Sequence, residues 1–211
     1  MSERSLTYDC GVTPRAAPLS ADERRDAIID VVVPLLLEHG SEVSTRQIAE
    51  AAGIAEGTIF RVFPDKAALW TATAERTLDP EVELAELHTA LAGTTDLRSK
   101  IVRTADHLLE RSQRVMAVMM VMRGVWMHDK THSPGRPPRF MIDANRALMA
   151  GLTELFEPHR GELSVEPEVA ASVLRTLALG SRHPGAHADY LLTPDEVADV
   201  MLDGVRRRGK D

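Results

Sequence analysis

The hydrophobic positions of this chain recur at the spacing of α-helices over almost its whole length. The first apolar face consists of Ala27, Ile28, Val31, Val32 and Leu35. Ser20-Ala-Asp-Glu23, just before this run, has the sequence of a capping box, in which a hydroxyl and a carboxylate satisfy free backbone amides at a helix start. The pattern therefore predicts a first helix that begins after Ser20 and ends at Gly40.

Two short helices separated by a tight turn follow. A second capping box, Ser44-Thr-Arg-Gln47, begins a helix that ends at Gly53, and a further helix is expected over 56–63. Gly53 can adopt the positive φ that such a turn requires. Ile59 and Phe63, four residues apart, share the inward face of the second helix. This is the helix-turn-helix arrangement, which directs its second helix into the major groove of DNA.

The remainder of the chain keeps helical periods, and Val, Ile and Thr never form the alternating runs of a strand. Asp65 is expected to cap a fourth helix that reaches Leu78. Later helices are expected at about 81–92, 96–111, 113–129, 139–157, 166–182 and 194–208. The predicted fold class is all-α, with about nine or ten helices. The chain is expected to divide into a flexible arm (1–19), a helix-turn-helix domain (20–78) and a C-terminal helical domain (79–211).

Charge limits how this chain can contact a polyanion. The net charge is -7, and phosphate affinity comes from Lys and Arg side chains, so any contact with DNA must be local. The single cysteine, Cys10, lies among Ser, Thr, Gly and Pro and supports neither an internal disulfide nor a multi-cysteine metal site. No secretory leader pattern is present, and no apolar run approaches the roughly 20 residues of a membrane span, so a cytoplasmic protein is expected.

Residues Ile48–Leu69 resemble the tetracycline-repressor (TetR) family. The stretch combines Ile-Ala, Ala-Gly-Ile, Gly-Thr-Ile-Phe-Arg, Phe-Pro and Lys-Ala-Ala-Leu in one register, and the resemblance spans roughly 22–75. It implies an all-α homodimer with an N-terminal three-helix DNA-binding domain. It also implies that the C-terminal domain binds a small-molecule effector and dimerises.

The resemblance also implies which residues contact DNA. Transferred position by position, they are Thr45, Arg46, Glu56, Gly57, Thr58, Phe60, Arg61 and Lys66. Arg46 and Lys66 would hold phosphates, the residues of 56–61 would face the groove, and Arg61 could make a bidentate contact with guanine. Phe60 and Val62 depart from the family, which often has Tyr and His there, so a phosphate-binding hydroxyl is missing.

A methionine-rich run marks the candidate effector site. Met116-Ala-Val-Met-Met-Val-Met122 puts soft side chains on successive turns of one helix, which suits either an irregular apolar ligand or ordinary core packing. The candidate ligand-binding residues are His107, Met116, Met119, Met120, Arg123, Trp126, Phe140 and Asn145.

The last two long helices carry the expected dimer interface. Their apolar stripes are Val169, Val173 and Leu177, and Val197, Met201 and Val205. The resemblance implies that these stripes pair across a two-fold axis. Such a dimer would bind a palindromic operator with half-sites about 34–36 Å apart. The expected function is a ligand-responsive transcriptional regulator, a repressor that a small apolar molecule releases from double-stranded DNA.

Two other functions remain as alternatives to this one. His183 and His187 with Asp189, and His128 with His132, suggest a metal-dependent enzyme, but no third ligand or acid–base pair stands at a recognised spacing. No catalytic residue, metal or cofactor is therefore expected. The acidic balance and Phe60 also allow a helical regulator that acts through protein partners and binds DNA weakly.

Overall fold

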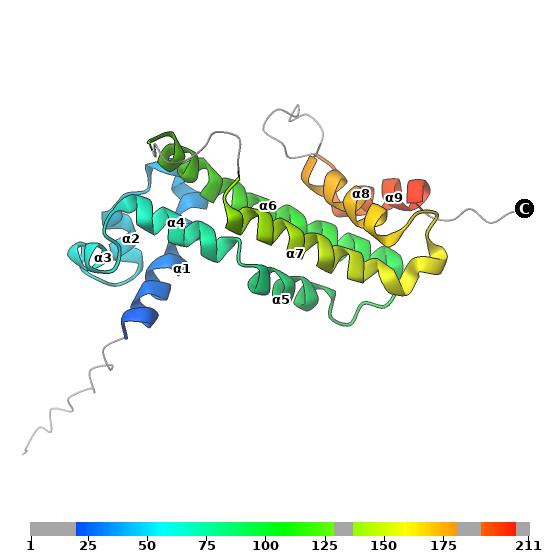
Figure 1. Ribbon diagram of the computed structural model, residues 1–211, viewed down its shortest axis with the longest axis horizontal. Helices are drawn as coiled ribbons and strands as arrows, with labels where there is room; N and C mark the ends of the chain where they lie inside the picture. Colours follow the sequence, from blue (N-terminus) through cyan, green and yellow to red (C-terminus); the bar gives the residue numbers. More distant parts are fainter. Residues whose placement is uncertain (1–19, 129–136, 181–190, 206–211) are drawn as a thin grey trace, which may run out of the picture.

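The computed structural model describes residues 20–128, 137–180 and 191–205, and this part is all-α without a strand (Figure 1). Its α-helices are α1 (Ala21–His39), α2 (Thr45–Ala51), α3 (Glu56–Val62), α4 (Lys66–Thr77), α5 (Pro80–Leu91), α6 (Leu97–His128), α7 (Arg139–Phe156), α8 (Pro167–Gly180) and α9 (Pro194–Val205). Two 3₁₀ turns, Gly40–Glu42 and Glu157–Glu162, follow α1 and α7. The expected all-α fold class is confirmed.

Side-chain caps set the starts of the N-terminal helices, as the sequence predicted. At α1, the Glu23 amide donates to Ser20 Oγ at 3.1 Å and the Ser20 amide donates to Glu23 Oε2 at 2.8 Å. Ser44 and Gln47 form the same pair of bonds at α2. Asp65 Oδ1 accepts from the Ala68 amide at 2.7 Å and caps α4. These bonds satisfy amides that a helix start otherwise leaves free.

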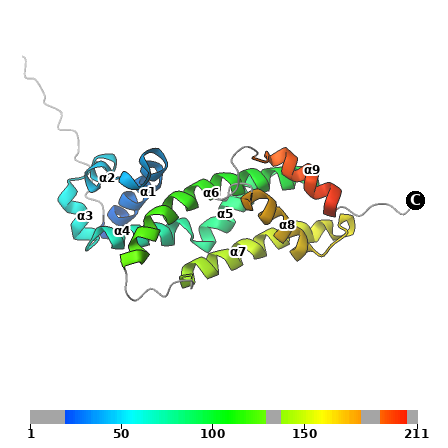
Figure 2. The same cartoon turned by 90° about the horizontal axis from the view of Figure 1, so that it is seen from above.

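The longest helix corrects one prediction. The sequence suggested two helices, 96–111 and 113–129, but α6 is continuous from Leu97 to His128. The polar residues between the two apolar stretches include neither Gly nor Pro, and Ser112 Oγ donates to the Leu109 carbonyl at 2.7 Å inside the helix. Figure 2 shows α6 running from the α9 end of the molecule to the α4 end.

Two hydrophobic cores lie along α6. The N-terminal core contains buried residues of α1 to α4, such as Ile28, Ile48 and Leu69, together with Val118, Val121 and Met122 of α6. The C-terminal core contains buried residues from 87 to 201, contributed by α5 to α9 and the segments between them. The last third of α6 therefore completes the core of the helix-turn-helix region, although the sequence assigned it to the other domain.

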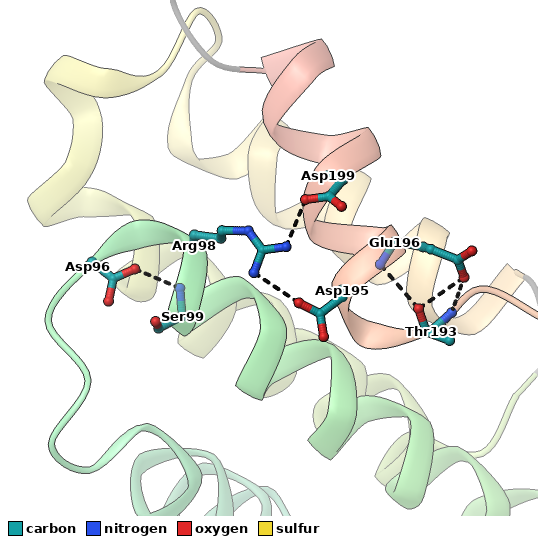
Figure 3. Close-up of polar contacts among 7 residues, drawn as sticks. All are labelled: Asp96, Arg98, Ser99, Thr193, Asp195, Glu196 and Asp199. Atoms are coloured by element: carbon teal, nitrogen blue, oxygen red, sulfur yellow. Dashed lines mark hydrogen bonds and ion pairs between the residues drawn. The ribbon is translucent and has the colours of Figure 1, made fainter.

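Close approaches hold the C-terminal helices together. A Cβ on Gly151 of α7 would lie 2.6 Å from Leu84 Cδ2 of α5, so only glycine permits this contact distance without a shift. Arg98 at the start of α6 donates to Asp195 at 2.9 Å and to Asp199 at 2.8 Å, both on α9 (Figure 3). Thr193 and Glu196 cap the same helix (Figure 3).

The orientation of α9 corrects the expected dimer stripe. Val197 and Met201 are 0% and 1% exposed and belong to the C-terminal core, because α9 packs along α6. They cannot also face a second protomer. The exposed apolar residues of these two helices are Val169 on α8 and Val200 on α9. The side chain of Val205 lies outside the described residues.

Several sequence features fall outside the described part of the chain. These are the arm 1–19 with Cys10, the side chains of His128 and His132, and His183, His187 and Asp189. Within the described ranges, no group of three or more His, Cys, Asp or Glu side chains is placed to hold a metal ion. No helix of those ranges is long and apolar enough to cross a membrane.

Candidate DNA-binding interface

Helix α3 lies at the surface with one face buried and the other exposed. Ile59 and Phe63 are each 1% exposed and belong to the N-terminal core. Phe60, between them, is 50% exposed, and Arg61 is exposed as well. Figure 1 shows α3 at the extremity of the molecule. The outward face is therefore free to enter a groove, as the sequence predicted.

The turn before α3 has the expected geometry. Gly53 has a φ of 65°, a conformation that side-chain-bearing residues rarely adopt. The Ile54 amide donates to the Ala49 carbonyl at 2.9 Å and closes the turn. Gly57 is exposed, and a Cβ placed on it would meet no protein atom within 4 Å. Packing within the protein therefore does not require glycine at position 57.

Two of the residues predicted to contact DNA form a hydrogen bond with each other. Thr45 Oγ1 at the start of α2 donates to Glu56 Oε1 at the start of α3, at 2.5 Å. The bond joins the two helices of the motif at their N-termini. The bond uses only one carboxylate oxygen of Glu56, and the Glu56 side chain is exposed.

The basic residues predicted to hold phosphates have different surroundings. Arg46 on α2 is exposed. Lys66 is half-buried, its Nζ donates to the Val43 carbonyl at 2.7 Å, and it lies 5.2 Å from the centroid of the Trp70 ring. A phosphate-binding role for Lys66 stays a prediction. The structure shows in addition that Lys66 forms a hydrogen bond within the protein, to Val43.

The sequence reasoning missed two arginines at the start of α1. Arg24 and Arg25 line a hollow of about 590 Å³ between α1 and α3, and Arg61 lines the same hollow. The Arg25 guanidinium lies 4.7 Å from the centroid of the Phe63 ring. The adjacent pair of arginines just after a capping box was the available signal. Arg24 and Arg25 add positive charge beside α3.

The structure does not bring the eight candidate ligand-binding residues together. Met116, Met119 and Met120 line a surface groove of about 650 Å³ between α1, α6 and α8. Trp126 and Phe140 are half-buried and pack against the N-terminal core. Arg123 and Asn145 are exposed, and His107 is half-buried near Glu83. Only the three methionines share one concave site.

A buried polar cluster beside that groove was also missed. Arg111 Nε of α6 forms an ion pair with Glu83 Oε2 of α5, and the two residues are 8% and 3% exposed. The imidazole of His107 lies 3.4 Å from the other oxygen of Glu83. Burial, followed by repulsion from Arg114 and Arg175, lowers the pKa of Arg111 to about 10. No sequence signal paired these residues, because they lie 28 positions apart.

Comparisons with known proteins agree with this geometry. Residues 28–73 match the family described as "Bacterial regulatory proteins, tetR family". The HTH-type transcriptional regulator BetI of Yersinia pestis is 28% identical over 167 residues, which are 78% of this chain and 83% of the relative. Nucleoid occlusion factor SlmA of Haemophilus ducreyi is 37% identical over 59 residues, only 29% of its length.

Solved structures share the whole fold. The TetR regulator SCO0520 of Streptomyces coelicolor has a TM-score of 0.60 and 22% identity, covering 88% of this chain and 99% of that one. A TetR protein of Mycobacterium vanbaalenii also has a TM-score of 0.60, with 21% identity over 89% and 97% of the two chains. With α3 exposed on one face and buried on the other, residues 28–73 are a DNA-binding segment of the kind found in the tetR family of bacterial regulatory proteins, and the chain is a DNA-binding transcriptional regulator.

Proposed function

We propose that this regulator is a homodimeric repressor that binds a palindromic operator and is released by a small molecule. One observation carries the DNA-binding part. Helix α3 exposes Gly57, Phe60 and Arg61 while Ile59 and Phe63 seat it on the N-terminal core. A helix held in this way can enter the major groove without unfolding its own domain.

The exposed residues suggest a division of roles. Arg61 reads a guanine through two hydrogen bonds, and Gly57 lets the backbone of α3 approach the bases. Thr58, half-buried, and Phe60 make apolar contacts with bases or sugars. Thr45, Arg46 and Lys66 hold phosphates, and Arg24 and Arg25 extend the basic surface. The second carboxylate oxygen of Glu56 faces the major groove of the DNA.

Dimerisation through α8 and α9 gives the operator its symmetry. Exposed Val169 and Val200 supply apolar surface on these helices, and an isologous contact would use both on each protomer. Two copies of α3 would then meet half-sites one helical turn of DNA apart. Since its target is chromosomal DNA, we also place the protein in the cytoplasm.

Selection of DNA from a random library with the purified protein tests the proposal. We expect an enriched palindrome, and fluorescence anisotropy on that sequence should show that Arg61→Ala weakens binding at least tenfold, within the range of about 1–3 kcal/mol for a bidentate base contact. Arg139→Ala is the matched control, because the side chain of Arg139 is 94% exposed on α7, far along the chain from α3.

Two outcomes would contradict the proposal. If Arg61→Ala and Arg139→Ala bound the selected sequence equally well, α3 would not read the operator in this way. If no sequence were enriched at all, the alternative of a regulator that acts through protein partners would replace it. Sedimentation of the protein with and without the operator reports the dimer separately.

A further inference from the structure

The surface groove between α1, α6 and α8 gathers exposed apolar side chains. Leu37 is 51% exposed, Met116 40% and Met120 58%, and all three line it. Its volume of about 650 Å³ lies within the range of about 300–1,000 Å³ that small-molecule sites occupy. Methionine side chains adapt to irregular ligands, so the wall suits an apolar body.

One end of this groove is cationic. Arg111 lines it, and the guanidinium of Arg111 already binds the carboxylate of Glu83. Arg175 of α8 is close enough to repel Arg111, and Leu179, one turn further along α8, lines the groove as well. A second guanidinium therefore stands near the Arg111–Glu83 pair, on the face of α8 that carries Leu179.

Arg175 has an unmet bonding requirement. Its Nε atom is buried and has no hydrogen-bond partner in the part of the chain that the structure describes. A buried donor without a partner costs free energy, although the rest of the Arg175 side chain is only half-buried. An anionic oxygen is the group that would satisfy both the donor and the charge.

We propose that this groove binds an amphiphilic monoanion, with its apolar body against Leu37, Met116 and Met120 and its acid group at Arg175 and Arg111. This inference rests on the proposed ligand response and names the chemistry of the ligand. A neutral apolar molecule would leave the excess positive charge uncompensated. A cation would add to it.

The same site contacts the DNA-binding region directly. Leu36, Leu37 and Gly40 form its α1 wall, and Leu36 is 2% exposed within the N-terminal core. A ligand seated here would touch both α1 and α6, and it would change how the helix-turn-helix domain sits on the rest of the molecule. Differential contacts of this kind are what couples two binding sites.

Three probes with a ten-carbon chain test the head-group preference: decanoate, decan-1-ol and decyltrimethylammonium, titrated below their aggregation concentrations into the full chain by calorimetry. We expect decanoate to bind at least tenfold more tightly than decan-1-ol, with the ammonium compound weakest. Arg175→Met should remove the preference for the acid. Arg146→Met should keep it, because the side chain of Arg146 is 75% exposed on α7.

A second variant tests the groove and not the charge. Met120→Asn places a neutral polar side chain on an exposed wall position and should weaken decanoate binding at least tenfold, with an unchanged circular dichroism spectrum. Equal affinity of the acid and the alcohol for the wild type would overturn the proposal, as would an acid preference that survives Arg175→Met.

The titration separates this inference from the proposed function, because it contains no DNA. If decanoate binds as expected but does not release the selected operator, the groove proposal stands and ligand-controlled release fails. If the protein shows no preference for decanoate while Arg61→Ala still weakens operator binding at least tenfold, DNA recognition stands and the groove proposal fails.

Discussion

Lys66 Nζ donates a hydrogen bond to the backbone carbonyl of Val43, 2.7 Å away, and so joins the first turn of α4 to the segment just before α2. Val43 is fully buried, which places this bond at the edge of the N-terminal core. The ammonium carries two further protons that can still reach a phosphate. Lys66 thus supports the domain whether or not it touches DNA.

Replacing this lysine should affect stability as well as DNA binding. Lys66→Met removes the donor and keeps much of the apolar stem, so the free energy of unfolding should fall by about 1–3 kcal/mol, the cost of losing a hydrogen bond from a charged group. Urea unfolding measures it. If Lys66 also holds a phosphate, the slope of log K against log salt should shrink by about 0.9. An unchanged urea midpoint would show that the bond to Val43 contributes nothing.

Gly57 should show opposite effects on stability and on DNA binding. A Cβ there meets no protein atom, so Gly57→Ala should raise the free energy of unfolding by up to about 1 kcal/mol through backbone entropy. A side chain at position 57 would point toward the DNA major groove. The larger side chain of Gly57→Leu should therefore hold α3 away from the bases and weaken operator binding at least tenfold.

Gly124 on α6 is the matched control for Gly57. It is also exposed, and a Cβ on it would also meet no protein atom within 4 Å. Gly124→Ala and Gly124→Leu should leave operator affinity within twofold of the wild type. If the two leucine variants weakened binding equally, α3 would have no special approach to DNA.

Met122 and Met120 lie two residues apart on α6 and should differ sharply. Met122 is 1% exposed in the N-terminal core, so Met122→Ala should lower the free energy of unfolding by about 2–5 kcal/mol. Met120 is 58% exposed, and Met120→Ala should change the free energy of unfolding by less than about 0.5 kcal/mol. Chemical denaturation of the two variants compares their free energies of unfolding. Similar losses of stability would contradict the finding that α6 completes the N-terminal core.

His107 should make stability depend on pH. Burial lowers the pKa of its imidazole and Arg114 lowers it further, although Glu86, Glu110 and Asp106 oppose the shift. The unfolded chain, with an ordinary pKa of 6.5, then takes up the proton more readily. The free energy of unfolding should therefore fall as the pH drops below 6.5.

Urea unfolding at pH 7.5 and 5.5 checks the sign. The loss between the two pH values should be smaller in His107→Gln than in the wild type, and His88→Gln, on an exposed residue of α5, should behave like the wild type. A wild type that gains stability at pH 5.5 would show that Glu83 favours the protonated imidazole after all.

Much of the N-terminal half could be read from local sequence. Ser20, Ser44 and Asp65 cap the helices that their positions predicted, and Gly53 adopts the expected turn. These features depend on residues within one or two turns of each other, so neighbouring residues suffice to predict them. Methionine spacing placed Met116 and Met120 on one helix, but it could not separate them from the buried Met122.

By itself, therefore, the sequence determined the helices other than the continuous α6, the helix-turn-helix and the outward face of α3, because each arises from short-range periodicity and capping. Only the tertiary structure decided which face of each long helix is buried. It turned Val197 and Met201 inward against α6, used Met122 to complete the N-terminal core, and brought Glu83, Arg111 and Arg175 together from three helices. Such contacts join residues far apart in the chain, and a helical period does not say which partner a face will meet.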